Sequence, residues 1–596
     1  MHLKKTPNKE TGRIYLSMVK SYWNKEKGYS SSKQIEKFGY IDDLKKEYDD
    51  PIAHFTKIVE ERNRLDNEES MEYIIHVKKN QTLEKNTNNR KNYGYIVILK
   101  ILSELGLDGF LNRRQRATKI EYCTSAIMKL LVVSRILSPG SKKRAYKEKG
   151  RYFDFESDKG FNLQNLYRSL SHFSRLSKDI QLLIHNRIKK HYTRKTDLIY
   201  YDVTNYYFEI DMEDNLRKNG FSKENRRSPI VQLGLSMDEE GLPISYEVFA
   251  GNESEKLHLR PIISELIRKY DTSKIIAVAD SAQNTGNNIY FLDEARQGYV
   301  FSQSIRGGSK DFKEYVISED NYKWYYRKDE EGKIRKKYKR KSRNCIKEIS
   351  VDFIKDGKQY KKKIEVEQRQ IVFYSEKYAA RARKKREEAV KKAHKIITNP
   401  SAYTKATSYG ALKYVKNVVV DKKTGELKES EGKPFFDYDQ VLEDEKYDGY
   451  YSIVTNVYDE EVNKGKFDDD AIIGIYRGLW KIEDNFRVSK SDLKLRPIYL
   501  TREERIHSHF LICFIALVVT RLIQKRTRNR HSAAELIKAM NDISCSYEGE
   551  NLFLFDHRSD VIDDLGETFG IDFTQQRLTR SEIKKRLGAA KKVKKT

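Results

Sequence analysis

The stretch "DLIYYDVTNYYFEI", from Asp197 to Ile210, is where the sequence changes from helical to strand-like patterning. It is rich in β-branched and aromatic residues, a composition that favours a strand. Asp202 lies in the middle of it. An ionised carboxylate inside a buried strand is costly unless it is paired or bound to a metal ion. The stretch therefore predicts a strand that carries a carboxylate in need of a partner.

The segments that follow alternate between strand and helix patterns. They are the hairpin "PIVQLGLSM"–"DEEG"–"LPISYEVFAG", the helix "EKLHLRPIISELIRKY", the apolar strand "SKIIAVAD", the helix "NTGNNIYFLDEARQ" and the strand "GYVFSQS". A continuous apolar strand such as "SKIIAVAD" is typical of a parallel arrangement inside a sheet. This order predicts an α/β fold in which helices flank a mixed sheet.

A second carboxylate, Asp280, closes the strand "SKIIAVAD". Ligands of open α/β sheets collect at the carboxyl ends of strands. If this strand is a neighbour of the one that holds Asp202, both carboxylates face one point. The alternative is structural, with Asp202 as a turn or cap residue and Asp280 as the N-cap of the next helix.

A third carboxylate, Glu483, belongs to "YRGLWKIEDNFRVSK", which runs from Tyr476 to Lys490 and has a helical pattern. At 100° per residue, one strip within roughly 40° of a line holds Tyr476, Trp480, Glu483, Arg487 and Lys490. An apolar stripe lies beside it. If the ligand is a nucleic acid, Tyr476, Arg487 and Lys490 would hold its phosphates, and Trp480 would pack on a sugar or base. The alternative is an i,i+4 ion pair between Glu483 and Arg487.

Three carboxylates without His or Cys form an oxygen-only set that suits Mg²⁺, or Mn²⁺ as a substitute. Two such ions can activate a nucleophilic oxygen and stabilise the leaving oxygen at a phosphodiester. Other motifs are weaker. His507 and His509 point to different faces of a helix, and "IRGGSK" has only a lone glycine pair.

Composition points to a polyanionic partner. The chain has 596 residues, a net charge of +28 and a pI near 9.4, and nucleic acid is the commonest partner of so basic a protein. A merely lysine-rich protein is the alternative. The four cysteines form no CxxC pair, which fits a reducing cytosol. The longest apolar run, "FLICFIALVV", is too short to span a bilayer and predicts a buried helix, so we expect a cytoplasmic protein without membrane contact.

Residues 301–400 hold 30 Lys and Arg against 15 Asp and Glu. We predict that they form an arm that embraces DNA, since basic side chains that neutralise phosphates release counterions. The residues expected to contact DNA there are Arg335, Lys336, Lys337 and Lys339. Trp324 and Tyr325 would either stack on an unpaired base or pack in the core.

These residues resemble a known family, the DDE transposases of bacterial insertion sequences of the insertion-sequence-four type. That family carries Y-x2-R-x3-E-x6-K on the helix of its catalytic Glu. Tyr476, Glu483 and Lys490 keep this spacing, while Leu479 occupies the Arg position. Arg477 and Arg487 are the two residues left for that phosphate contact. Further similar blocks are "YYDVTNYYFE", "GNESEKLHLRPII", "VADSAQN", "DGYYSIVTN" and "LRPIYLTREERIHSHFLICFIALVV"; "GRIYLSMVKSYW" resembles the start of one subgroup more loosely.

The resemblance implies an RNase H-like fold with a β-rich insertion before the catalytic Glu. It implies that Asp202, Asp280 and Glu483 are the catalytic, metal-binding triad, with Thr204 in a supporting place. It further implies that water cuts each transposon end and that the freed 3′-OH attacks target DNA. The partner would be double-stranded DNA, both the terminal inverted repeats and the target. The protein would act as a homodimer on paired ends, at the nucleoid.

We predict six regions along the chain. They are a strand-rich region at 1–66, a helical region at 92–195 that is a candidate for DNA end binding, the first part of the catalytic domain at 197–304, the basic insertion at 305–445, the second part with Glu483 at 446–530, and a C-terminal helical region with a basic tail at 531–596. A polar linker is expected at 67–90.

Three other functions compete with this interpretation. An RNase H-like nuclease that only hydrolyses DNA would use the same triad. A domesticated, non-catalytic DNA-binding protein would tolerate loss of a carboxylate, yet all three are present. An RNA-binding structural protein would explain the charge but not the carboxylates.

Overall fold

The computed structural model describes residues 1–592, apart from 9–10, 25–28, 69–81, 83–84, 86–88, 156–159, 211, 221–227, 271, 273, 329–331, 405–406, 409, 422–425, 431 and 459–466. Most of the predicted linker at 67–90 and the end of the basic tail therefore lie outside the described residues. The chain divides into two compact units. One is residues 1–85 with 548–550, and the other is residues 86–547 with 551–596.

The first unit is a three-stranded antiparallel sheet with two helices. Its strands β1 (His2–Pro7), β2 (Ile14–Asn24) and β3 (Tyr29–Tyr40) pair in chain order, and the helices are α1 (Ile41–Leu44) and α2 (Pro51–Glu68). Phe38 and Phe55 stack with ring centroids 4.3 Å apart, beside the buried Leu16 and Ile41. The strands lie where the sequence predicts a small sheet.

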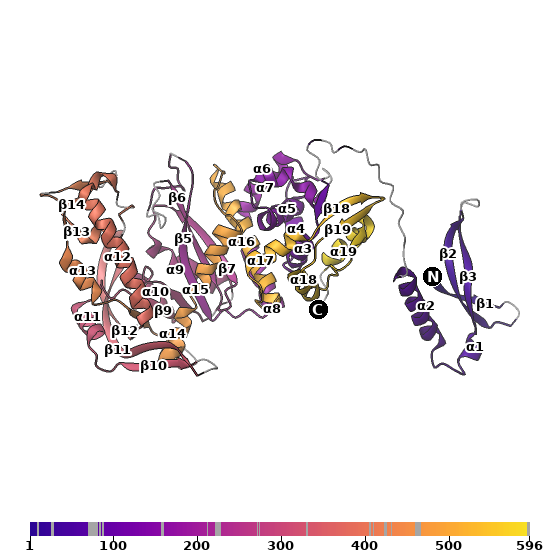
Figure 1. The fold of residues 1–596 in the computed structure, drawn as a ribbon, viewed down its shortest axis with the longest axis horizontal. Coiled ribbons are helices and arrows are strands. Elements are labelled where there is room, and N and C mark those ends of the chain that lie inside the picture. The colour runs from indigo at the N-terminus through magenta and orange to yellow at the C-terminus, as the bar shows by residue number, and fades with distance from the viewer. Residues whose placement is uncertain are drawn as a thin grey trace. The chain divides into compact units, whose positions relative to one another are not determined.

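The second unit is built on a nine-stranded mixed sheet (Figure 1). Its first five strands are β5 (Leu198–Tyr207), β6 (Ile230–Met237), β7 (Pro243–Ala250), β8 (Ile276–Ala279) and β9 (Gly298–Gln303). They lie in the order β7-β6-β5-β8-β9. β5, β8 and β9 run parallel, while β6 is antiparallel to both of its neighbours. The predicted α/β class, with helices that flank a mixed sheet, is confirmed.

The insertion extends this sheet rather than forming a separate one. Beyond β9 come β17 (Tyr450–Thr455), β12 (Lys358–Tyr374), β11 (Ile334–Lys355) and β10 (Lys323–Lys328), each antiparallel to the next. β11 and β12 form a long hairpin that closes at Lys355 and Lys358. The insertion also contains α11 (Lys310–Ile317), α12 (Glu376–Thr398), α13 (Tyr438–Glu445), and the short strands β13 (Val415–Lys416), β14 (Val418–Val420), β15 (Leu427–Glu429) and β16 (Phe435–Phe436).

The two faces of the sheet bury different side chains, as the two-residue period of a strand requires. On one face Ile199, Tyr201 and Ala277 pack with α9 (Leu259–Lys269) and α10 (Gly286–Glu294). On the other, Tyr200 and Val278 pack with α14 (Asp469–Arg477), α15 (Trp480–Arg487) and α16 (Glu503–Arg526).

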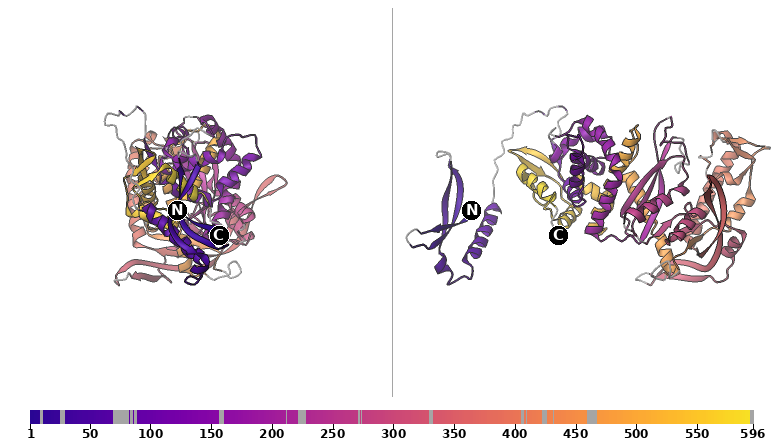
Figure 2. Two further views of the ribbon diagram at one scale, coloured as in Figure 1. Left: turned by 90° about the vertical axis from the view of Figure 1, so that its right-hand side faces the viewer. Right: turned by 180° about the vertical axis from the view of Figure 1, so that it is seen from behind.

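Helix α16 joins the sheet to the helical region. Figures 1 and 2 show it, in orange, between the strands β5–β7 and the helices α3 (Tyr95–Glu104), α4 (Leu107–Arg116), α5 (Thr124–Leu137), α6 (Lys142–Lys147), α7 (Leu163–Arg175) and α8 (Ser177–Tyr192). Among the described helices it alone is long and apolar enough to cross a membrane, and 89% of its apolar window is buried in the protein. The buried helix predicted at "FLICFIALVV" is therefore confirmed.

The C-terminal region differs from the helical one that the sequence predicts. Besides α17 (Ala533–Asp542), α18 (Asp560–Phe569) and α19 (Arg580–Ala590), it contains β18 (Ser544–Gly549), β19 (Leu552–Phe555) and β20 (Arg577–Thr579). These strands form a sheet in the order β20-β19-β18-β4, in which β4 (Arg90–Asn92) comes from the start of this unit. The pairing of β18 with β4 joins residues more than 400 positions apart, which no local pattern reports.

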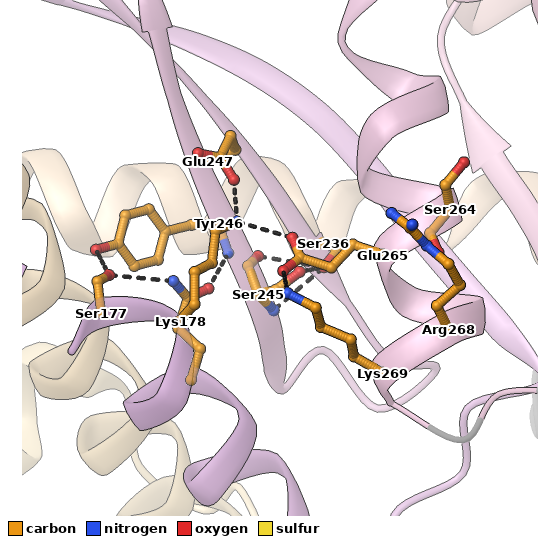
Figure 3. A network of polar contacts seen from close by, with 11 residues as sticks. Ser177, Lys178, Ser236, Ser245, Tyr246, Glu247, Ser264, Glu265, Arg268 and Lys269 are labelled. Carbon is orange, nitrogen blue, oxygen red and sulfur yellow. Dashed lines mark hydrogen bonds and ion pairs between the residues drawn. The ribbon is translucent and has the colours of Figure 1, made fainter. Parts of the chain in front are cut away.

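The edge strand β7 is tied to α8 and α9 by polar contacts (Figure 3). Lys178 of α8 forms ion pairs with Glu247 of β7 and with Glu265 of α9, the latter at 2.8 Å. Burial raises the pKa of Glu265, but hydrogen bonds from Lys178 and Lys269 outweigh it and the pKa is lowered. These contacts fix the edge of the sheet farthest from the insertion.

Candidate functional site

Asp202 lies in β5, and Asp280 directly follows the neighbouring strand β8. β5 and β8 pair in parallel, with Ile199 opposite Ala277 and Tyr200 opposite Val278. Continuing this register by two residues places Asp202 opposite Asp280. Because side chains alternate along a strand, both carboxylates share the face of Tyr200 and Val278, which α14 and α15 cover. The sequence predicts that the two carboxylates meet if their strands are neighbours, and β5 and β8 are neighbours.

Neither aspartate is explained as a cap. Asp202 lies inside β5 and accepts a hydrogen bond from the Val203 N–H at 2.7 Å. Asp280 accepts one from the Ala282 N–H at 3.0 Å in the turn after β8. The N-cap of α10 is Thr285, so the helix-cap alternative for Asp280 is wrong.

The loop after Asp280 is anchored by three amide side chains that the sequence analysis missed. Gln283 donates a hydrogen bond to the Glu255 carbonyl, Asn284 to the Ser302 carbonyl and Asn288 to the Gln283 carbonyl, at 2.9–3.0 Å. The signal for them was the amide-rich "AQNTGNN" directly after a buried strand. These bonds connect the loop to β9 and to the segment before α9, and so hold Asp280 in place.

The helix predicted from Tyr476 to Lys490 is not continuous, which corrects the single strip expected from the sequence. α14 ends at Arg477, α15 begins at Trp480, and a π-helical turn covers Val488–Asp492. A Cβ atom at Gly478 would lie 2.0 Å from the Tyr200 hydroxyl oxygen, and that hydroxyl donates to the Ile475 carbonyl at 3.0 Å. The lack of a side chain at Gly478 therefore lets the chain approach Tyr200 of β5 at this point. α15 packs on β5, and α14 packs on β8 and β9.

Glu483 is exposed on α15, and within the described part of the chain its side chain makes no hydrogen bond or ion pair. The alternative pair with Arg487 is wrong. Arg487 instead binds Asp484 at 2.9 Å and Asp492 at 3.3 Å, and the hydrogen bond with Asp484 raises the pKa of Arg487. The structure thus leaves Glu483 available and commits Arg487 to its own carboxylates.

The remaining residues of this segment take different positions. Tyr476 has its hydroxyl oxygen 2.5 Å from that of Tyr451 on β17. Burial raises the pKa of Tyr476, and the charges of Tyr451 and Asp280 raise it further. Arg477 lies over the Tyr338 ring at 5.3 Å, and Trp480 is 61% exposed. Lys490 has its Nζ 5.4 Å from the centre of the buried Tyr206 ring.

Asp202, Asp280 and Glu483 do not form a complete metal site in this structure. Among the described residues, no three His, Cys, Asp or Glu side chains lie close enough to hold a metal ion. Burial raises the pKa of the Tyr201 phenol, and the negative charges of Asp202 and Asp280 both raise it further. Thr204 is buried and follows Asp202 by two positions on β5. Asp202, Asp280 and Glu483 have the oxygen donors that a hard cation prefers, but the structure does not bring all three within reach of one ion.

Neither histidine of "HSH" supports a metal site. His507 faces Glu503 at 3.7 Å. His509 is buried and bonds to the fully buried Lys142 amine at 3.1 Å and to the Leu495 carbonyl at 2.9 Å. His509 therefore has a packing role beside the segment that follows Glu483.

The basic insertion uses several of its cations internally. Lys339, predicted to contact DNA, is instead buried and paired with Glu319 at 2.5 Å, with its Nζ 4.6 Å from the centre of the Tyr322 ring. The side chains of Arg335, Lys336 and Lys337 lie outside the described residues. Trp324 is 42% exposed, and Tyr325 stacks on Tyr338 at 5.4 Å.

Two arginines of the hairpin hold the start of α14. Arg340 binds Asp470 and Arg369 binds Asp469, each at 2.6 Å. Burial raises the pKa of Asp469, but hydrogen bonds from Arg369 and Ser342 lower it below its usual value. This contact was not predicted from the sequence, although the acidic "FDDDAII" before an apolar helix was a signal for it. The insertion therefore helps to position the helix pair that carries Glu483.

Two family models match the chain. The family model for the transposase DDE domain matches residues 208–519, which include Asp280 and Glu483. The model for the N-terminal domain of IS1634 family transposases matches residues 3–72. No curated protein matches the chain. Among solved structures, the piggyBac transposase synaptic complex with hairpin DNA is similar at 7% identity and a TM-score of 0.35, over 85% of this chain and 86% of that one. Because the DDE match covers more than half of the sequence, this protein belongs to the DDE transposases, as a transposase of an insertion sequence.

Proposed function

We propose that this transposase cuts the DNA ends of its insertion sequence and joins the freed 3′-OH to target DNA. The observation that carries the proposal is the parallel pairing of β5, which contains Asp202, with β8, which Asp280 directly follows, on the sheet whose one face α15 with Glu483 covers. The strand order β7-β6-β5-β8-β9, with three antiparallel strands followed by two parallel ones, supports an RNase H-like domain. The spacing of Tyr476, Glu483 and Lys490 supports the insertion-sequence-four type.

The cofactor in this proposal is Mg²⁺, with Mn²⁺ as a substitute. When two ions are bound, they supply activation of the attacking oxygen and stabilisation of the leaving oxygen. Asp202, Asp280 and Glu483 would hold them, since their oxygens are the ligands that such cations prefer. Hydrogen bonds from the amide side chains of the loop restrict Asp280 before DNA arrives, and phosphoryl transfer depends mostly on such positioning.

The side chains around the triad would orient the DNA. Arg477 is the better of the two arginines for the phosphate contact, because Arg487 is already paired with Asp484 and Asp492. Lys490 and Tyr476 would position the cleaved strand. The exposed Trp480 would pack on a sugar or base. The DNA partners are the terminal inverted repeats and the target duplex, bound in the cytoplasm at the nucleoid by a homodimer on paired ends.

A nuclease that only hydrolyses DNA would use the same carboxylates, so the joining step needs its own test. A duplex that ends in the element's inverted repeat, labelled at the transferred 3′ end, is incubated with the protein, Mg²⁺ and an unlabelled target duplex. We expect the label to appear first in a cut product and then in the target. Cutting without transfer of the label would identify a nuclease, and a lack of cutting would contradict the proposal.

A further inference from the structure

We infer that the exposed face of α12 is a track for the phosphate backbone of the duplex that is being cut; this rests on the proposed function. Five exposed cations on this helix lie within about 40° of one line. They are Lys377, Arg381, Lys384, Lys391 and Lys395. Figure 1 shows α12 beside the strands of the insertion.

The opposite side of α12 fixes the helix to the protein. Ala393 and Ile396 are buried there. Arg386 is buried on the same side and pairs with Asp448 and with Glu445, the latter at 3.1 Å. The helix is therefore anchored by its far face, and the line of cations points away from the packed core.

Within the described residues, none of these five cations makes an ion pair or a hydrogen bond. Several cations of the neighbouring strands do have acidic partners. Arg343 pairs with Asp311 at 2.9 Å, while Lys339, Arg340 and Arg369 have the partners given above. One exposed carboxylate, Glu388, lies on the same line as the five cations. The described residues thus place five unpaired cations in a line on α12, besides exposed lysines elsewhere in the insertion such as Lys358, Lys361 and Lys362.

The line begins next to the catalytic face. Tyr378, the neighbour of Lys377, stacks on Tyr451 with ring centroids 6.1 Å apart. Tyr451 bonds to Tyr476, on whose pKa the charge of Asp280 acts. From Lys377 to Lys395 the helix rises about 27 Å. That length matches about eight nucleotide steps of 3.4 Å along one strand. A small anion would need convergent groups, whereas an extended line suits a duplex backbone.

The test compares two triple variants that remove the same charge from the same insertion. One is Arg381→Gln, Lys384→Gln and Lys391→Gln on α12. The matched control is Lys358→Gln, Lys361→Gln and Lys362→Gln, three exposed lysines at the hairpin turn between β11 and β12. DNA affinity is measured against salt concentration. Each lost phosphate contact lowers the slope of log K against log salt by about 0.9, so the α12 variant should lose about 2 to 3. The control should keep the wild-type slope.

A second readout gives the direction of the track. A photoreactive benzophenone side chain is placed in turn at positions 377, 384 and 395, and the crosslinked nucleotides of an end-bearing duplex are mapped. We expect crosslinks progressively farther from the cut bond in that order. The inference would be overturned if the crosslinks did not follow this order. It would also be overturned if the two triple variants had equal slopes, or if the α12 variant kept the wild-type slope.

These outcomes are separate from a failure of the proposed function. If the wild-type protein cuts no end-bearing duplex, the proposed function fails, while the contrast between the two slopes still decides the role of α12. If the wild type cuts and the α12 variant keeps its slope, only the inference about α12 fails.

Discussion

Tyr451 of β17 and Tyr476 of α14 share a hydrogen bond, with their hydroxyl oxygens 2.5 Å apart. Tyr451 also contacts Phe373 of β12, at 5.4 Å between ring centroids, and Tyr378 of α12. Burial raises the pKa of both phenols, so both keep their protons at neutral pH. This pair connects the insertion to the helix that leads to Glu483, close to Asp280.

The first prediction concerns the Tyr451 hydroxyl. Tyr451→Phe keeps the ring and removes one hydrogen bond, a loss of about 1 kcal/mol. If this bond positions Tyr476, the rate of end cleavage should fall about 5-fold to 10-fold while DNA affinity stays unchanged. Tyr450→Phe, at the next position and on the other face of β17, is the control. Cleavage by the two variants is compared in single-turnover assays, and equal rates would show that the Tyr451–Tyr476 bond has no role in positioning.

The second prediction concerns the helix break. Gly478→Ala places a methyl group 2.0 Å from the hydroxyl oxygen of the buried Tyr200, so α15 must move away from β5. Overpacking of this kind costs about 1 to 3 kcal/mol. We expect lower stability in denaturant and a loss of cleavage. Gly474→Ala is the control, since nothing lies within 4 Å of its Cβ. It should be neutral or stabilise α14 by up to about 1 kcal/mol. The same destabilisation in both variants would mean that the Tyr200 contact is not the cause.

The third prediction uses the ion pair between Arg369 and Asp469. The pKa of Asp469 is lowered in the folded protein, so its contribution to stability is fully present above the unfolded pKa of about 3.9. It is lost as the pH falls through the lower, folded pKa. Asp469→Asn should reduce the protection of α14 amides from hydrogen exchange at pH 7 by about 2 kcal/mol.

The difference between wild type and Asp469→Asn should then shrink as the pH approaches 3. Asp468 accepts a hydrogen bond from the Ala471 N–H and so caps α14. Asp468 is unchanged in both proteins, so the two differ only in the contacts of the Asp469 carboxylate. A difference that stays constant from pH 7 to pH 3 would show that the carboxylate charge does not hold the helix.

Much of the central sheet can be predicted from the sequence because its strands are locally unambiguous. β5 and β8 are dense in apolar, aromatic and β-branched residues, and the carboxylates of Asp202 and Asp280 stand out against them. Such a contrast requires no knowledge of the tertiary structure. The same holds for α16, whose apolar residues surround the helix on all sides and so indicate burial.

The features that the sequence did not predict depend on distant partners. The helical period continues through Gly478, and the sequence does not show that a side chain there would collide with Tyr200. Lys339 has the composition of a DNA contact, yet Glu319 and a group of tyrosines enclose it. The pairing of β18 with β4 joins the two ends of the second unit. In each case a tertiary contact decides between outcomes that the local pattern leaves open.

The role of Asp202, Asp280 and Glu483 is tested most directly by the rate at which single variants of them cut an end-bearing duplex in Mg²⁺. Asp202→Asn, Asp280→Asn and Glu483→Gln each keep the shape of the side chain and remove one negative charge. We expect each variant to cut roughly 100-fold or more slowly, because the three carboxylates act as one unit. DNA binding in a parallel gel shift should survive, and the control Asp293→Asn, an exposed carboxylate on α10, should cut normally. If any one triad variant cuts at the wild-type rate, that residue is not part of the site. If all three do, the three carboxylates are not the catalytic groups of this protein.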